Sequence, residues 1–416
     1  MKWALYNLLF LAVYPFLLPG FLLRMARRGG YAARMGDRIA LYPADVRSGL
    51  LKHSGKWVWI HAVSVGEVQV AGQLMRQWRE VEPDVRFCFS TTSSTGWKMA
   101  EREVTPRDQL VYNPLDFPNF VKSALATVKP RAVILTESEI WPCFIRTAAK
   151  RRIPLFLINA RVSDRSAPRY RMARWWFADV LGSFTRIFAQ SDVDRERLVA
   201  AGAPERNVEV SGSFKFDVAR RDEDKERELR EWIGPGRLLV GGSTWPGEDE
   251  ALISIFRKIS GMKLVIAPRH FEKADAVEAN IAKAGFRCVR RSRGDSGEGD
   301  VYLCDTTGEL MGLYGIADVV FVGKSLCAHG SQNMIEPCLC GRPTLVGPYT
   351  ENFRPVMADL LSAGGVVQVR DAAELEKKIL ELVRDGGDLG KRAAAAVGRR
   401  KGVVSKCVSE IRERLG

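Results

Sequence analysis

The sequence contains no Cys-x-x-Cys pair, although it has eight cysteines. Most of these lie in apolar runs, so we expect buried free thiols in a reducing compartment rather than disulfides. Histidine is scarce: the chain has four, and no two are spaced to share one face of a helix. A structural zinc site is therefore not expected.

Motifs of ATP hydrolysis and of dinucleotide redox chemistry are also missing. The loop Gly242–Glu248 lacks the Gly-Lys-Ser/Thr ending of a Walker loop, and no G-x-G-x-x-G follows the first strand of either half. Gly242-Ser243-Thr244, followed by Gly247-Glu248, instead lies between a predicted strand and a predicted helix. Such a helix start either binds an anion with its N–H groups or is a plain Ser/Thr cap.

Acidic residues are too few to balance the basic ones. The chain has 63 Lys and Arg against 49 Asp and Glu, a net charge of +14. This excess indicates an anionic partner, which is a nucleic acid, an anionic lipid or a phosphorylated substrate.

No charge occurs between Trp3 and Leu23, and five arginines follow within residues 24–38. The apolar run is just long enough to cross a bilayer, and no small-x-small cleavage site follows it. Two prolines and a glycine interrupt it, so a segment that dips into the inner leaflet rivals a full span. We expect a membrane anchor with a basic flank over residues 1–35, with the body on the cytoplasmic side. A buried core helix is the alternative.

The rest of the chain alternates short apolar runs with helical patterns, which predicts mostly parallel sheets with helices on both faces. A densely charged stretch from Asp217 to Arg237 separates two such series. The expected strands lie near residues 57–63, 86–91, 131–136, 155–159, 186–190 and 208–211, then 238–243, 263–269, 286–291, 300–305, 318–323, 343–347 and 365–369. The predicted fold is α/β, with two doubly wound domains. Their expected bounds are residues 36–213 and 237–395, with a linker at 214–236 and a C-terminal helix at 396–416 that packs back on the first domain.

Ligands of doubly wound sheets bind beyond the carboxyl ends of the strands, so the expected active site is a cleft between the two domains. Polar residues follow predicted strands in both halves. A single such residue is often a cap or a turn, and their recurrence is the stronger signal. They are Glu67, Glu137, Glu139, Asn159, Arg161, Ser243, Thr244, Arg269, Gly308 and Glu309.

Seven motifs follow one another along the chain. They are HAVSVGE, TESEIWP, NARVSDRS, GSFKFD, APRH, DTTGELMGLYGIADVVFVG and NMIEP…GRPTLVGPYTENF. In order and spacing they resemble the 3-deoxy-D-manno-octulosonic acid (Kdo) transferases of Gram-negative bacteria. The resemblance implies a GT-B glycosyltransferase with two Rossmann-like domains facing a cleft. It implies transfer of Kdo from CMP-Kdo to a lipid A precursor, lipid IVA, in lipopolysaccharide biosynthesis at the cytoplasmic face of the inner membrane.

Residue roles follow from the same resemblance. Glu67 falls on the catalytic base, and Glu137 and Lys215 fall on positions that stabilise the transition state. The implied reaction is an inverting displacement without a cofactor or a metal. Four departures, at Trp245, Lys324, Ser331 and Gln332, leave the contacts to the Kdo group open. The expected donor-binding residues are Ser243, Thr244, Pro268, Arg269, Thr307, Gly308, Glu309, Asn333, Met334, Ile335 and Glu336.

The implied lipid acceptor and an anionic membrane surface account for the positive charge without a nucleic acid. The segment Arg165–Trp176 either touches headgroups or acceptor phosphates, or is a solvated helix with a buried Trp pair. Two other functions stay open. One is a UDP-sugar transferase of the same fold. The other is a non-enzymatic membrane-surface or nucleic-acid-binding protein, against which the strand-end glutamates argue.

Overall fold

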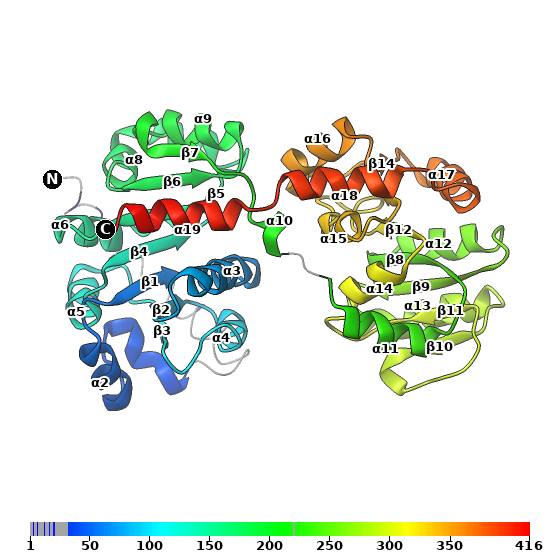
Figure 1. Ribbon diagram of the computed structural model, residues 1–416, viewed down its shortest axis with the longest axis horizontal. Coiled ribbons are helices and arrows are strands. Elements are labelled where there is room, and N and C mark those ends of the chain that lie inside the picture. The colour runs from blue at the N-terminus through cyan, green and yellow to red at the C-terminus, as the bar shows by residue number, and fades with distance from the viewer. Residues whose placement is uncertain are drawn as a thin grey trace. The chain divides into compact units, whose positions relative to one another are not determined.

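The computed structural model describes Trp3, Tyr6, Ala12, Phe16 and Gly20, residues 32–218 and residues 221–416. The chain divides into two compact units. Unit 1 comprises Met1–Val218 with Gly402–Gly416, and unit 2 comprises Ala219–Lys401. Within the described residues, each unit contains one seven-stranded sheet flanked by helices (Figure 1).

The sheet of unit 1 has the order β3-β2-β1-β4-β5-β6-β7, and neighbouring strands are parallel. Its strands are β1 (Trp57–His61), β2 (Arg86–Thr91), β3 (Gln109–Tyr112), β4 (Ala132–Thr136), β5 (Leu155–Ala160), β6 (Arg186–Ala189) and β7 (Val208–Val210). The flanking helices are η1 (Ala32–Ile39), α2 (Ala44–Lys52), α3 (Val65–Val81), α4 (Ser94–Ala100), α5 (Pro118–Val128), α6 (Pro142–Lys150), α7 (Ala167–Met172), α8 (Arg174–Leu181), α9 (Asp192–Ala200), η2 (Glu205–Asn207), α10 (Lys215–Val218) and α19 (Val403–Glu413).

The sheet of unit 2 has the order β10-β11-β9-β8-β12-β13-β14 and is also parallel. Its strands are β8 (Arg237–Thr244), β9 (Met262–Pro268), β10 (Cys288–Arg290), β11 (Val301–Leu303), β12 (Val319–Val322), β13 (Thr344–Val346) and β14 (Val367–Gln368). Its helices are α11 (Glu223–Ile233), α12 (Glu248–Phe256), η3 (Phe271–Lys273), α13 (Ala274–Lys283), η4 (Arg291–Arg293), α14 (Leu310–Ile316), α15 (Ile335–Leu339), η5 (Glu351–Phe353), α16 (Arg354–Ser362), α17 (Ala372–Arg384) and α18 (Leu389–Arg399).

Alternate residues of β1 enter different cores, which is why this strand reads as one continuous apolar run. Trp57 and Trp59 join the core formed with α5 and α6. Val58 and Ile60 join the core formed with α3 and α19 on the opposite face. Burial on both faces places β1 in the interior of the sheet, with only its carboxyl end left to build a site.

Each sheet has a topological switch point where successive connections turn in opposite directions. In unit 1 the chain runs from β1 outward to β3 and then returns to β4, so the switch point lies between β1 and β4. In unit 2 it lies between β8 and β12 for the same reason. Ligands of open α/β sheets bind beyond the carboxyl ends of such strands.

Residues 214–236, expected as a linker, contain the helix α11. Its surface is charged, but Leu229 and Ile233 are buried, and α11 packs against α14. At the other end of unit 2, the chain continues from α18 into α19, which packs against α3 of unit 1 (Figure 1).

The cysteines that the structure describes form no disulfide. Five are buried and two are partly exposed, whereas Cys327 is exposed and departs from the expected burial.

The predicted anchor over residues 1–35 lies largely outside the described residues. Trp3 and Tyr6 pack on the body of unit 1: the Trp3 ring lies 5.4 Å from that of Trp176, and the Tyr6 hydroxyl donates to Asp116 at 2.9 Å. Among the helices that the structure describes, none is long and apolar enough to span a bilayer.

Candidate active site

Glu67 is placed by the N-terminus of α3, directly after β1. Ser64 caps the helix, its hydroxyl accepting the Glu67 N–H at 3.3 Å, while the Glu67 carboxylate accepts the Ser64 N–H. This reciprocal pair is a capping box, which a Ser-x-x-Glu sequence predicts. The glutamate is thus held against the end of β1 instead of extending into solvent, and its side chain is buried.

The hydrogen bonds of the Glu67 carboxylate all end on one oxygen. Oε2 accepts the Val63 N–H at 2.7 Å, the Ser64 N–H at 3.3 Å and the Thr136 hydroxyl at 3.4 Å. Thr136 also donates to the carbonyl of His61 at 3.0 Å, which joins the ends of β1 and β4 at the switch point. Oε1 has no hydrogen-bond partner among the described residues, so it is available to a ligand proton.

Glu137 begins the loop after β4 in a left-handed conformation, with φ of 50°. Its Oε1 accepts the amide N–H of Asn159 at 3.2 Å. Asn159 is fully buried at the end of β5, and its own amide oxygen accepts the Phe214 N–H at 3.1 Å. One asparagine therefore connects the Glu137 loop to the segment that begins α10 at Lys215.

Burial raises the pKa of Glu137, and the charge of Glu67 raises it further, while Lys215 and Arg161 oppose the increase. Burial also lowers the pKa of Lys215, opposed by Glu137. These effects are mutual, because each group stabilises the charged form of the other. The structure thus brings Glu67, Glu137 and Lys215 of the sequence prediction into one charged cluster in unit 1.

Glu139 and His61 belong to the same switch point; Glu139 was listed from the sequence as a strand-end residue without a role, and His61 was not predicted. His61 ends β1 with its ring fully buried, and its Nδ1 lies 2.9 Å from the Ser90 hydroxyl. Its Nε2 has no hydrogen-bond partner within the described part of the chain and lies 3.9 Å from Glu139 Oε2. Burial lowers the pKa of His61 to about 3. Burial, with the charge of Glu67, raises the pKa of Glu139 to about 7. His61 was hidden in an apolar run, and only the strand order places it beside Glu139.

In unit 2, Ser243 and Thr244 end β8, and both side chains are buried. The amides of the following helix start are already occupied: the Trp245 N–H donates to Glu248 at 2.9 Å and the Gly247 N–H to Glu250 at 2.7 Å. These contacts fill two amides that an anion would need, and the expected Ser/Thr cap is wrong as well, because the N-cap of α12 is Gly247 rather than Ser243 or Thr244. A ligand here would meet side chains, not the amides of Trp245 and Gly247.

Pro268 and Arg269 follow the adjacent strand β9. The Arg269 N–H donates to the Thr244 carbonyl at 3.0 Å, which fixes the backbone beside β8. The Arg269 side chain is exposed and has no ion-pair partner in the described part of the chain. A planar, unpaired guanidinium beyond a strand end suits a phosphate or a carboxylate.

Thr307, Gly308 and Glu309 lie between β11 and α14. Thr307 and Gly308 are exposed, and Gly308 has φ of 87°. The Glu309 carboxylate instead turns inward, accepting from the Thr306 hydroxyl at 2.6 Å and from Arg291 Nε at 3.2 Å. Burial alone would raise its pKa, but these bonds, with one from Cys304, outweigh it and lower the pKa. Of these three predicted residues, only Thr307 and Gly308 are therefore exposed to a ligand.

The four residues from Asn333 to Glu336 lead into α15, which begins at Ile335. The Asn333 side chain accepts the Ile335 N–H at 3.2 Å and donates to Glu336 Oε1 at 3.0 Å. Burial raises the pKa of Glu336. Met334 and Ile335 are fully buried, so either residue could reach a ligand only through its main chain.

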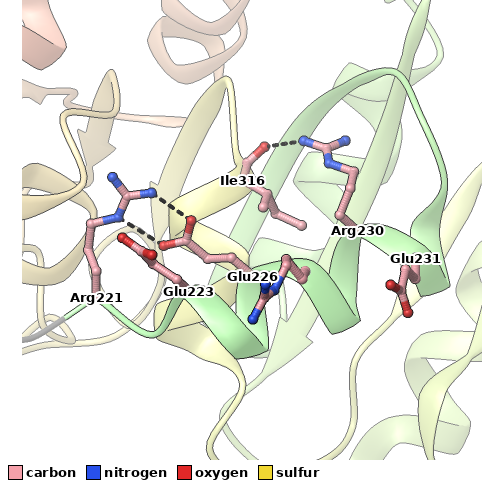
Figure 2. Close-up of a pocket in the computed structure, with 7 residues that line it drawn as sticks. Arg221, Glu223, Glu226, Arg230, Glu231 and Ile316 are labelled. Carbon is pink, nitrogen blue, oxygen red and sulfur yellow. Dashed lines mark hydrogen bonds and ion pairs between the residues drawn. The ribbon is translucent and has the colours of Figure 1, made fainter.

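A pocket of about 550 Å³ lies elsewhere in unit 2, along α11. Figure 2 shows Arg221 forming two bonds to Glu226, and Arg230 donating to the Ile316 carbonyl. None of the predicted site residues lines this pocket. In the described residues, no three His, Cys, Asp or Glu side chains gather in a way that could hold a metal ion.

Comparison with known proteins agrees with the motifs. The profile of a family described as 3-deoxy-D-manno-octulosonic-acid transferase matches residues 33–218. A 3-deoxy-D-manno-octulosonic acid transferase of Bordetella pertussis is 34% identical over 388 residues, which is 87% of either chain. The chain belongs to the Kdo transferase family. A further Kdo transferase, from Haemophilus influenzae, is 31% identical over 350 residues, or 82% of either chain.

As a member of the Kdo transferase family, the protein is a glycosyltransferase. Among solved structures, a UDP-GlcNAc 2-epimerase from Neisseria meningitidis bound to UDP-GlcNAc matches with a TM-score of 0.58. It is 14% identical and covers 84% of this chain and 100% of that chain, so the likeness concerns the fold alone. The predicted α/β class with two doubly wound Rossmann-like units, as in GT-B proteins, is confirmed.

Proposed function

We propose that this protein transfers Kdo from CMP-Kdo to a lipid A precursor, lipid IVA, in lipopolysaccharide core biosynthesis. Membership of the family supports the transferred sugar. One structural observation supports the chemistry: the Glu67 carboxylate is fixed at a switch point through Oε2, while Oε1 has no partner among the residues described. A general base needs this combination of a fixed position and an open oxygen.

The proposed reaction is a single displacement with inversion. Glu67 takes the proton from a sugar hydroxyl of the acceptor, and the resulting oxygen bonds to the anomeric carbon of Kdo. The bond from that carbon to the phosphate oxygen breaks, and its electron pair leaves with CMP. Since the base is fixed, positioning of the hydroxyl contributes much of the acceleration. No metal takes part in the proposed steps, so transfer is expected to continue in EDTA.

Glu137 and Lys215 are proposed to stabilise the transition state from unit 1. Burial strengthens their interactions with a developing charge, because the local dielectric constant is low. In unit 2, Arg269 is proposed to hold the phosphate of CMP, and the segments Thr307–Glu309 and Asn333–Glu336 to hold the nucleoside. Support for the unit 2 assignments is that Arg269 and the segment Thr307–Glu309 follow the carboxyl ends of β9 and β11.

We place the reaction at the cytoplasmic face of the inner membrane, with an anionic lipid surface as a partner. Helices α7 and α8 support this placement, because Met172 and Trp175 are 82% and 64% exposed. Four exposed arginines lie in the same segment: Arg165, Arg169, Arg171 and Arg174. Apolar side chains among basic ones are typical of surfaces that contact headgroups. The two tryptophans expected to be buried together differ: Trp175 is exposed, whereas Trp176 packs on Trp3.

The deciding experiment incubates the protein with CMP-Kdo and lipid IVA and measures the lipid products by mass spectrometry. The wild type should add Kdo, and E67Q should reduce transfer by about a thousandfold or more. Glutamine can keep the capping box, so E67Q should fold normally. E80Q, on the exposed side of α3, is the matched control. Transfer by E67Q at half the wild-type rate would remove Glu67 as the base.

A thermal-shift comparison of CMP with UDP separates the proposed donor from a UDP-sugar. CMP should raise Tm and UDP should not at the same concentration, because only the bound nucleotide stabilises the folded state. Stabilisation by UDP alone would contradict CMP-Kdo as the donor.

A further inference from the structure

Two side chains that the proposed function does not use flank the switch point of unit 2. Trp245 directly follows β8, and Lys324 lies two residues beyond the end of β12. The strands are tightly joined there: the Gly323 N–H donates to the Gly242 carbonyl at 2.9 Å. A Cβ on Gly323 would come within 2.3 Å of the Ser243 carbonyl oxygen, so a glycine is needed. This close approach fixes where the two side chains emerge.

A single buried carboxylate holds both backbones. Glu248 accepts the N–H of Trp245 at 2.9 Å and that of Lys324 at 2.8 Å. It also accepts the N–H of Ser325 and Leu326, at 3.0 and 2.9 Å. Lys324 itself has φ of 54°, a left-handed conformation that is uncommon for a residue with a Cβ. The loop thus imposes a strained conformation on a lysine, and such strain is concentrated at functional positions.

The Lys324 ammonium lies over the indole of Trp245, with Nζ 5.1 Å from the ring centroid. His270 packs edge-on against the same indole at 5.0 Å, which fixes the ring from another direction. Lys324 is partly buried and has no ion-pair partner in the part of the chain described. The Trp245 Nε1–H is buried and has no hydrogen-bond acceptor among the described residues. A fixed cation and an unsatisfied donor therefore lie together at the switch point, which an anionic oxygen group would complete.

The donor of the proposed function carries two anions, the nucleotide phosphate and the carboxylate of the sugar acid. Arg269 and Lys324 lie on opposite sides of β8, at the ends of its two neighbours β9 and β12. The planar fork of Arg269 suits the phosphate, whereas the compact ammonium of Lys324 suits a single carboxylate. We infer that Lys324, positioned by Trp245, binds the carboxylate of the donor sugar and selects acidic sugars. This inference rests on the proposed function.

The test compares K324G and K324M with the wild type. Glycine adopts the left-handed conformation without strain, so K324G should fold at least as well as the wild type. Both variants should raise KM for CMP-Kdo about tenfold or more, as for loss of a charged hydrogen bond. Their Kd for CMP alone, measured by calorimetry, should stay within about twofold. K324R should recover part of the loss, and K283M, an exposed lysine on α13, should behave as the wild type.

Several outcomes would overturn the inference. An equal loss of affinity for CMP and for CMP-Kdo would assign Lys324 to the phosphate. An unchanged KM in K324G would show that the ammonium contacts no part of the donor. Wild-type protein that binds CMP but transfers no Kdo would instead contradict the proposed function, so the two failures are distinguishable.

Discussion

At the scale of single residues, Glu139 and His61 have pKa values displaced in opposite directions. The Glu139 pKa is raised to about 7 from 4.5, mainly by burial. Between pH 4.5 and about 7, the folded protein therefore keeps a proton on Glu139 that the unfolded chain has released. The contribution of this group to the free energy of unfolding is fully present below pH 4.5. The contribution is lost as pH rises through the folded pKa. The pKa of His61 is lowered to about 3, so its contribution to the free energy of unfolding is present above pH 6.5 and is lost as pH falls toward 3.

We predict that E139Q flattens the pH dependence of unfolding. Between pH 4.5 and 7.5, the free energy of unfolding of the wild type should fall relative to E139Q by about 3 kcal/mol. Urea titrations at four pH values in this window measure the difference, and E80Q should follow the wild type. Parallel curves for E139Q and the wild type would contradict a protonated Glu139. Groups elsewhere in the chain contribute equally to both proteins and cancel.

Asn159 permits a second residue-scale prediction. Its amide joins Glu137 to Phe214, and its φ of 52° suits asparagine or glycine. N159A should lower the free energy of unfolding by about 2–4 kcal/mol, since two buried hydrogen bonds and a tolerated left-handed conformation are lost together. N159G should lose about 1 kcal/mol less, because it removes only the amide. Equal losses in the two variants, by urea unfolding, would show that the backbone conformation contributes nothing.

At the scale of elements, α19 completes unit 1 from the far end of the chain. Asp217 accepts the N–H of Gly402 at 2.7 Å and of Val404 at 2.8 Å, which anchors the start of the helix. Ile411 is fully buried in the core that contains Ile60 and α3. This core supports the strand that ends at His61, so α19 stabilises the element that carries the site.

I411A is therefore predicted to destabilise unit 1 by about 2–4 kcal/mol, the range for truncating a buried isoleucine. Hydrogen exchange measured by mass spectrometry should show faster exchange in β1 and α3, with the peptides of β8 and β12 unchanged. E413A, on the exposed face of α19, should change neither. Uniform acceleration across both units would mean that α19 does not stabilise unit 1 selectively.

Most of these elements could be predicted from the sequence, and the exceptions have physical reasons. The strand β3 was not predicted, because Gln109–Tyr112 is short and only two of its four residues are buried. The helix α11 was read as a linker, because its buried apolar residues Leu229 and Ile233 lie among eight charged residues, which mask the helical period. Glu67 was recognisable, since Ser-x-x-Glu after an apolar run specifies a capped helix.

At the scale of the whole molecule, the order of the strands in a sheet determines which side chains meet. The spacing of apolar residues along the sequence predicts the strands but not their order. Glu67 and Glu139 are 72 residues apart in sequence, yet both follow strands that flank one switch point. The same argument applies to Trp245 and Lys324 in unit 2. Glu139, Trp245 and Lys324 could be singled out from the sequence and His61 could not, and the pairs His61–Glu139 and Trp245–Lys324 required the topology.

The net charge of +14 leads to the last prediction, which concerns the membrane surface. The protein should sediment with vesicles that contain about 30% anionic lipid, and less so as salt rises, because salt screens headgroup attraction. Replacing Arg169, Arg171 and Trp175 together by serine should weaken this binding about tenfold or more, at about 1 kcal/mol for each basic residue. A variant with Lys377 and Lys391 of unit 2 replaced by serine removes two exposed charges elsewhere, as many as the test variant, and is the matched control. Equal weakening in the two variants would indicate attraction by total charge, and only a selective loss supports docking through α7 and α8.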